Sequence, residues 1–221
     1  MTRRRARGFT LVELAVGLLI IALLLGMFMV PLSTQFDQQR YAETQRQLDM
    51  AREAVIGFAL ANGRLPCPAT PTTPITTAGA GDENCALTEG VVPWSALGVP
   101  ETDAWGRRFT YRVTAAFADA PAAGLLSSFL LTDNGNITIT NGSINIATLV
   151  PAVIVSHGKN GLGAYKPDGL QLSGATGNEL ENANNTATFV SRTNAPDFDD
   201  LVTWVSASVL KTRMVAGGRL P

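Results

Sequence analysis

Residues 3–31 read RRRARGFTLVELAVGLLIIALLLGMFMVP, and this stretch decides how the chain begins. Between Phe9 and Leu32 the only charged side chain is Glu13. As an α-helix, residues 9–32 would extend about 36 Å, against a hydrocarbon core of about 30 Å. We therefore expect residues 9–32 to form a transmembrane helix. A carboxylate within such a helix needs an explanation, because a charge in the hydrocarbon core is energetically costly.

The apolar segment is preceded by basic residues and by no acidic residue. These are Arg3, Arg4, Arg5 and Arg7. A basic flank stays in the cytoplasm, so the rest of the chain should be exported. A secretory signal peptide is disfavoured, because its apolar core is about 7 to 15 residues long and a small-x-small cleavage site follows it. The residues after Val30 show no A-x-A pattern. A plain membrane anchor is the remaining alternative, and it leaves Glu13 unexplained.

Residues 7–13, RGFTLVE, resemble the processing site of type IV prepilins and type II secretion pseudopilins. The resemblance implies that the prepilin peptidase cuts between Gly8 and Phe9 and that the new amine is methylated, giving N-methylphenylalanine. Residues 1–8 would then be a leader peptide. The implied partners are the prepilin peptidase/methyltransferase, other pilin or pseudopilin subunits and an inner-membrane assembly platform. The implied location is the inner membrane with a periplasmic domain, and then the pilus or pseudopilus.

Cleavage would give Glu13 a partner. The new ammonium at Phe9 would lie about 6 Å along the helix axis from Glu13. Two opposite charges in lipid cost much less together than apart. The resemblance implies staggered packing of subunits in a helical filament, so a neighbouring ammonium can meet this carboxylate. We therefore expect Glu13 to be an assembly residue.

Cleavage would also make the chain acidic. The full chain has 17 basic and 18 acidic side chains. Removing the leader leaves 13 basic and 18 acidic side chains, a net charge of −5. An acidic chain is poorly suited to binding a phosphate backbone, so nucleic acid is not expected as a partner.

The helix should continue beyond the membrane. Leu48, Ala51, Val55 and Ala59 recur at helical spacing and predict one apolar face of an amphipathic half at residues 33–62. Pro31 should kink the helix without ending it, and Asn62-Gly63 should end it.

Cys67 and Cys85, the only cysteines, flank a loop rich in Pro, Thr and Gly. In the periplasm they should form a disulfide bond, which would add about 3 kcal/mol of stability. Two free buried thiols are the alternative. A metal site at the cysteines is disfavoured, because the chain has one histidine.

Residues 63–221 are expected to form a periplasmic β-rich globular domain. The sequence ITIT-NG-SINI at 137–146 predicts a hairpin with a two-residue turn, which would place Ile139 opposite Ile144 and Ile137 opposite Ile146. Further strands are expected at 107–113, 127–132 and 152–156, with antiparallel pairing. Residues 200–217 should form a strand and then a short helix. The expected fold class is α+β and pilin-like, a long N-terminal helix packed on an antiparallel β-sheet.

A second resemblance lies in this domain. The segments TDAWGRRFTYRV (102–113) and VIVSHGKNG (153–161) look like signatures of the major pseudopilin of type II secretion. In that subunit a loop after the second signature holds calcium. Residues 160–182 replace a short acidic loop of that pattern.

The resemblance implies that calcium would bind Asp197, Asp199 and Asp200, together with carbonyls near Ser156. Hard oxygen ligands beside a glycine-rich turn suit calcium. The alternative is that Asp199 and Asp200 simply begin a solvated strand.

No catalytic constellation is visible in the sequence. His157 follows Ser156 directly, and adjacency in sequence does not assemble a catalytic triad, so a structural histidine is expected. We interpret the chain as a minor pilin or pseudopilin, a structural subunit of a type IV pilus or type II secretion filament and not an enzyme. The size of residues 63–221 favours a low-copy subunit. The alternative is a pilin-like binding module at a filament tip, an adhesin or a DNA-uptake receptor.

Overall fold

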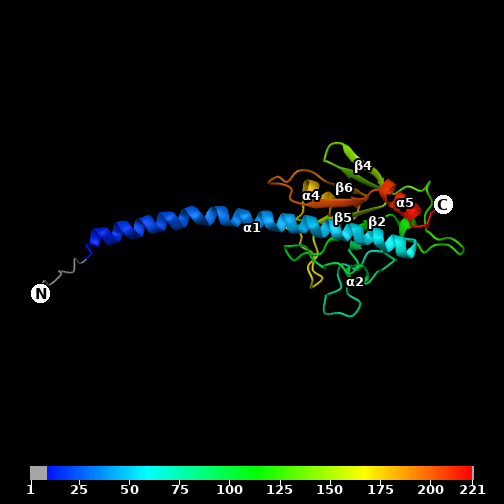
Figure 1. Ribbon diagram of the computed structural model, residues 1–221, viewed down its shortest axis with the longest axis horizontal. Coiled ribbons are helices and arrows are strands. Elements are labelled where there is room, and N and C mark those ends of the chain that lie inside the picture. Colours follow the sequence, from blue (N-terminus) through cyan, green and yellow to red (C-terminus); the bar gives the residue numbers. More distant parts are fainter. Residues whose placement is uncertain (1–8, 221) are drawn as a thin grey trace. The chain divides into compact units, whose positions relative to one another are not determined.

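The computed structural model describes residues 9–220, without the side chains of residues 25–34. The leader peptide predicted at residues 1–8, including Gly8, lies outside the described residues. The described chain falls into two compact units, one ending at Arg40 and the other beginning at Tyr41. Both contain part of the first helix, α1 (Leu11–Asn62), drawn in blue to cyan in Figure 1.

In the first unit, the described backbone is helical from Leu11 to Arg40, so α1 does not end at Pro31. Within the described residues, no helix has both the length and the hydropathy that crossing a membrane requires. The predicted membrane segment 9–32 includes residues 25–32, whose side chains lie outside the description.

In the second unit, α1 packs on a four-stranded antiparallel sheet. The strands are β1 (Glu89–Val91), β2 (Thr110–Val113), β5 (Ala152–Ser156) and β7 (Leu201–Val205), and they lie in the order β1-β2-β5-β7. The four predicted helix positions are all buried in this core: Leu48, Ala51, Val55 and Ala59. The predicted end of the helix at Asn62-Gly63 is also confirmed, because Gly63 has φ +73°, which favours glycine.

A three-stranded sheet covers the other face of β5. Its order is β4 (Asn145–Val150), β3 (Ile137–Thr140) and β6 (Thr188–Val190). Alternate residues of β5 divide between the two cores, with Ile154 packing toward α1, and Val153 and Val155 packing against Ile137 and Ile139. β5 is therefore buried on both faces, which agrees with its apolar sequence.

Short helices join these strands. They are α2 (Trp94–Leu97), α3 (Ala115–Ala118) and α4 (Gly177–Glu181). The longer α5 (Ala207–Ala216) follows β7 and ends at Gly217, so the predicted strand and helix near the C-terminus are both confirmed.

The predicted hairpin at 137–146 exists, but its register is wrong. β3 pairs Ile137 with Val150 and Ile139 with Ala147, and the loop runs from Asn141 to Ile144. The Asn141 side chain accepts hydrogen bonds from the N–H groups of Ser143 and Ile144, which favours this longer turn. Ile144 is consequently 64% exposed rather than paired in the core.

One further expectation is wrong, and the expectation of antiparallel pairing holds for every strand pair except one. Residues 127–132 form turns and bends instead of a strand. The Ser128 N–H donates to Gly63 O and the Leu130 N–H donates to the Asp133 carboxylate, so neither group is available for pairing with a neighbouring strand. Pairing is also not antiparallel throughout, since β6 pairs with β3 in parallel. The long connection through α4 permits this arrangement.

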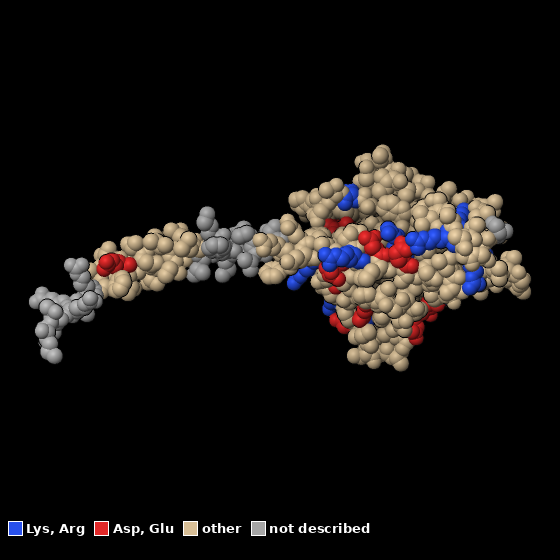
Figure 2. Space-filling view, viewed as in Figure 1, with Lys and Arg blue, Asp and Glu red and all other residues tan. Residues whose placement is uncertain are grey.

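Charged side chains are interleaved on the second unit. On the face shown in Figure 2, basic and acidic groups alternate and no large area of one sign appears. Part of this pattern consists of ion pairs on α1, such as Arg46 with Glu43 at 2.9 Å.

Candidate functional site

The N-terminus of α1 is capped by reciprocal hydrogen bonds between Thr10 and Glu13. The Glu13 carboxylate accepts from the Thr10 N–H at 3.0 Å and from the Thr10 hydroxyl at 2.9 Å. The Glu13 N–H donates in turn to the Thr10 hydroxyl at 3.2 Å. This is a capping box, and the spacing Thr-x-x-Glu in the sequence is its signature, which our sequence reasoning missed. Glu13 therefore has a role within its own chain.

The apolar side chains beside this cap are uncovered. Phe9 is 85% exposed and Leu11 is 88% exposed. Apolar side chains continue around the helix through residue 24, and most of them are exposed as well. A surface of this kind requires cover from lipid or from other protein.

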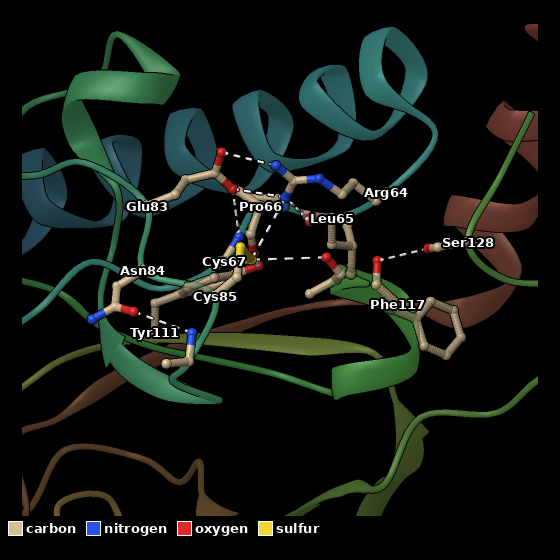
Figure 3. The surroundings of a disulfide bond; sticks show 12 residues. Arg64, Leu65, Pro66, Cys67, Glu83, Asn84, Cys85, Tyr111, Phe117 and Ser128 are labelled. Atoms are coloured by element: carbon tan, nitrogen blue, oxygen red, sulfur yellow. Dashed lines mark hydrogen bonds and ion pairs between the residues drawn. A yellow bond between two sulfur atoms is a disulfide. The ribbon is translucent and has the colours of Figure 1, made fainter. Parts of the chain in front are cut away.

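The predicted disulfide between Cys67 and Cys85 is present, with Cα atoms 5.0 Å apart (Figure 3). Glu83 lies beside it and accepts a hydrogen bond from the Cys67 N–H at 2.6 Å. Arg64 binds the same carboxylate through two hydrogen bonds, at 2.8 and 3.1 Å. The bond and the ion pair together hold the loop 67–85 against the end of α1.

Replacing Cys67 with serine is expected to lower the free energy of unfolding by about 3 kcal/mol, because the unfolded chain regains the freedom of an 18-residue loop. Chemical denaturation of the detergent-solubilised protein measures this change. Reduced wild type is the control and should lose the same amount. Ready alkylation of both cysteines in the native protein would contradict the assignment.

The two signature segments recognised in the sequence meet at Asp103. One of its carboxylate oxygens accepts from the N–H groups of Trp105 and Arg107, at 2.9 and 3.0 Å. The other accepts from the Ser156 hydroxyl at 2.6 Å. Burial raises the pKa of Asp103, and these hydrogen bonds oppose that shift. Asp103 thus joins the turn before β2 to the end of β5.

The same turn is attached to α1. The Ala104 N–H donates to the Thr44 hydroxyl at 3.3 Å, and the Trp105 ring meets the Tyr41 ring edge-on at 4.8 Å. The first signature therefore fixes the described helix from Tyr41 onward to the sheet. This role is structural.

Arg107 extends the connection to an acidic cluster. Its guanidinium donates to the carbonyl oxygens of Gly158 and Asn160. Asn160 then donates its N–H to Asp199 at 2.8 Å and its side-chain amide to Glu179 at 2.8 Å. These contacts position the cluster through backbone and amide groups.

The cluster consists of Glu179 on α4 with Asp199 and Asp200 before β7. Each offers a carboxylate oxygen within 4.8 Å of the other two. Glu179 and Asp200 are buried, and one oxygen of Asp199 and one of Asp200 have no hydrogen-bond partner among the described residues. Burial raises the pKa of Asp200 to about 8, and the neighbouring Glu179 and Asp199 add to the shift. Desolvated carboxylates with free lone pairs suit a cation.

One sequence expectation for this cluster needs revision. Asp197 is not part of it, because its exposed carboxylate pairs with Arg192 at 2.7 Å. Glu179 was missed, since it lies in the segment 160–182 that has no counterpart in the signature pattern and nothing local distinguishes it from a solvated glutamate.

His157 is buried beside the cluster and is structural, as expected. Its Nε2 is 2.8 Å from the Thr110 hydroxyl. Its Nδ1 is 3.9 Å from Asp200, but burial lowers the pKa of His157 to about 4, so the ring is neutral near pH 7 and forms no ion pair there.

Residues 3–29 match the family model described as the prokaryotic N-terminal methylation motif. No curated protein and no solved structure is significantly similar to the chain.

Proposed function

Because residues 3–29 carry the methylation motif that is the signature of type IV pilins and pseudopilins, we propose that the chain is a structural subunit of a type IV pilus or type II secretion filament. Its role is assembly, and the motif points to a family of structural subunits rather than enzymes. The motif is the observation that carries this proposal.

The exposure of the first unit supports it. Uncovered apolar side chains surround the helix from Phe9 to residue 24. In the proposed life cycle, lipid covers residues 9–32 before assembly, and neighbouring helices cover them in the filament core. Residues 33–62 continue the helix, and residues 63–221 form the periplasmic domain.

Glu13 is proposed to select the position of the neighbouring subunit. Its carboxylate is exposed, and its described partners all belong to Thr10. A carboxylate accepts several hydrogen bonds, so an ammonium from an adjacent Phe9 can join the Thr10 contacts. The cap then holds the carboxylate in place for this partner.

A low-copy position is proposed within the filament. The second unit contains a second sheet and the long segment 160–182, which adds α4 to the domain. Such additions suit a subunit that primes, caps or decorates a filament better than one repeated along its length. The subunit's partners are other pilins or pseudopilins and the inner-membrane platform.

The test is the mass of the mature chain. We expect the intact protein to lack residues 1–8 and to carry one methyl group on the amine of Phe9. A mature chain that begins beyond Val30 would refute the proposal.

We also propose that Glu179, Asp199 and Asp200 bind calcium. The fit rests on the two unpartnered carboxylate oxygens and on the burial of Asp200. Bound calcium would neutralise this cluster and join α4 to the start of β7. Ionised carboxylates are required, so affinity should rise as the pH increases from about 6 to about 9, through the raised pKa of Asp200.

Calcium at about one hundred times its dissociation constant is expected to raise the melting temperature of the detergent-solubilised chain by roughly 5 to 10 °C. Asp200→Asn and Glu179→Gln should remove most of this response. Asp197→Asn, which changes a carboxylate outside the cluster, is the matched control and should keep it. Equal melting temperatures with and without calcium would contradict the assignment, as would loss of the response in Asp197→Asn alone.

A further inference from the structure

A separate pocket, with a volume of about 300 Å³, is lined by residues of β1 and by Pro71 of the loop 67–85. Its floor includes Glu89 and Thr110 from the main sheet. Tyr165 and Gln171 belong to a first wall, and Asn185 belongs to a second wall. Both walls come from the chain between β5 and β6, where the sequence departs from the signature pattern.

The first wall is a short, firmly held hairpin. Tyr165 and Gln171 form a backbone bridge, and Gln171 donates its side-chain amide to Gly163 O at 2.9 Å. The fully buried Arg108 holds this hairpin in place. Its backbone N–H donates to Tyr165 O, and its guanidinium donates to Pro167 O. The wall is therefore preformed.

The second wall is held by Arg112. This guanidinium donates to the Asn185 carbonyl and, at 3.0 Å, to the Asn185 side-chain oxygen. Asn185 has φ +59°, a left-handed conformation that costs energy in a residue other than glycine. The two walls meet where Gly163, at φ +91°, would place an added Cβ 2.4 Å from the Ala183 Cβ.

The pocket is polar but electrically balanced. The Glu89 carboxylate pairs with Arg112 at 2.9 Å, and both side chains are largely buried. The pair leaves no uncompensated cation for a phosphate or other strong anion. Among residues 9–220, neither the Tyr165 hydroxyl nor the Asn185 side-chain nitrogen has a hydrogen-bond partner.

From this arrangement we infer that the pocket binds a neutral, hydroxyl-rich ligand, a saccharide unit. Amides and a phenol present both donors and acceptors, as neighbouring hydroxyl groups require. The Tyr165 ring adds an apolar face for the C–H side of a sugar ring. The volume suits one small ligand and excludes a folded partner. This inference goes beyond filament assembly and does not depend on it.

Saturation-transfer NMR on the detergent-solubilised full chain tests the inference. The probes are glucose, galactose, mannose and N-acetylglucosamine at about 10 mM each, a concentration at which even a millimolar dissociation constant gives a signal. We expect transfer to at least one of them. Gln171→Ala and Asn185→Gly should each weaken that binding about tenfold, because each removes a hydrogen-bonding amide.

Asn185→Gly is the sharper variant. Glycine adopts the left-handed conformation without strain and keeps the backbone carbonyl that Arg112 binds, which offsets the loss of the Arg112 contact to the side-chain oxygen, so the melting temperature should change little while the amide is lost. Gln45→Ala is the matched control, since it removes a glutamine on α1 outside this pocket. Absence of transfer to all four sugars would overturn the inference. Transfer that Gln171→Ala and Asn185→Gly leave unchanged would overturn it equally, as it would place binding elsewhere. Glu13→Ala should retain binding, so a failure of assembly is distinguishable from a failure of this site.

Discussion

A chain in which leucine replaces Gly8 is expected to remain at precursor mass in the inner membrane. The resemblance of residues 7–13 to prepilin processing sites implies cleavage after Gly8, where a side chain would enter the peptidase at the bond to be cut. Loss of a correctly placed scissile bond should reduce processing by about tenfold or more. Intact mass and membrane fractionation measure the ratio of precursor to mature chain.

Gly17→Leu is the matched control for this experiment. Gly17 lies in α1, and an added Cβ there meets nothing within 4 Å, so the substitution adds hydrophobic bulk without changing the residues at the cut. It should be processed as wild type. If Gly8→Leu matured at Phe9 as efficiently as Gly17→Leu, the assignment of the processing site would be wrong.

The helix and its buried face were predictable because the signal is periodic and local. Leu48, Ala51, Val55 and Ala59 repeat at helical spacing, and each one is buried against the sheet. Gly63 was predicted to end the helix, and it does so in the structure because it adopts the left-handed φ that favours glycine. The apolar run of β5 was equally informative, since both of its faces are covered.

Strand partners were not predictable to the same degree. The dipeptide Asn141-Gly142 favours a two-residue turn, yet the Asn141 side chain binds the N–H groups that follow and lengthens the loop. The parallel pairing of β6 with β3 depends on a connection of many residues, about which alternating apolar patterns carry no information.

The acidic cluster was likewise predictable only in part. Asp199 and Asp200 were identified from their place after a signature segment, whereas Glu179 comes from a helix inserted in between and only the fold brings it near. The Asp103–Ser156 contact joins the two signature segments, because each satisfies a buried polar group of the other. Single-sequence reasoning found both segments without finding this contact.

Glu13→Ala is expected to leave insertion and cleavage intact and to reduce filament incorporation strongly. The substitution retains the leader and the apolar run, and it removes a charge from the segment proposed to lie in lipid. It leaves the neighbouring Phe9 ammonium without its carboxylate in an apolar surrounding, which is costly for a buried charge. Crosslinking, or co-purification with sheared filaments, measures incorporation in cells where processing has been verified.

The capping box requires controls that separate two roles of Glu13. Glu13→Gln keeps a side chain that can cap Thr10 and accept a hydrogen bond from the ammonium, but it removes the charge, so a partial loss milder than that of alanine is expected. Thr10→Val keeps the carboxylate and the N–H of residue 10 that binds it, and removes only the hydroxyl contacts, so the loss of incorporation should be much smaller than that of Glu13→Ala. Equal losses in Thr10→Val and Glu13→Ala would show that capping, and not ammonium pairing, is what assembly needs. Wild-type incorporation of Glu13→Ala would remove both explanations, because neither the cap nor the ion pair survives that change.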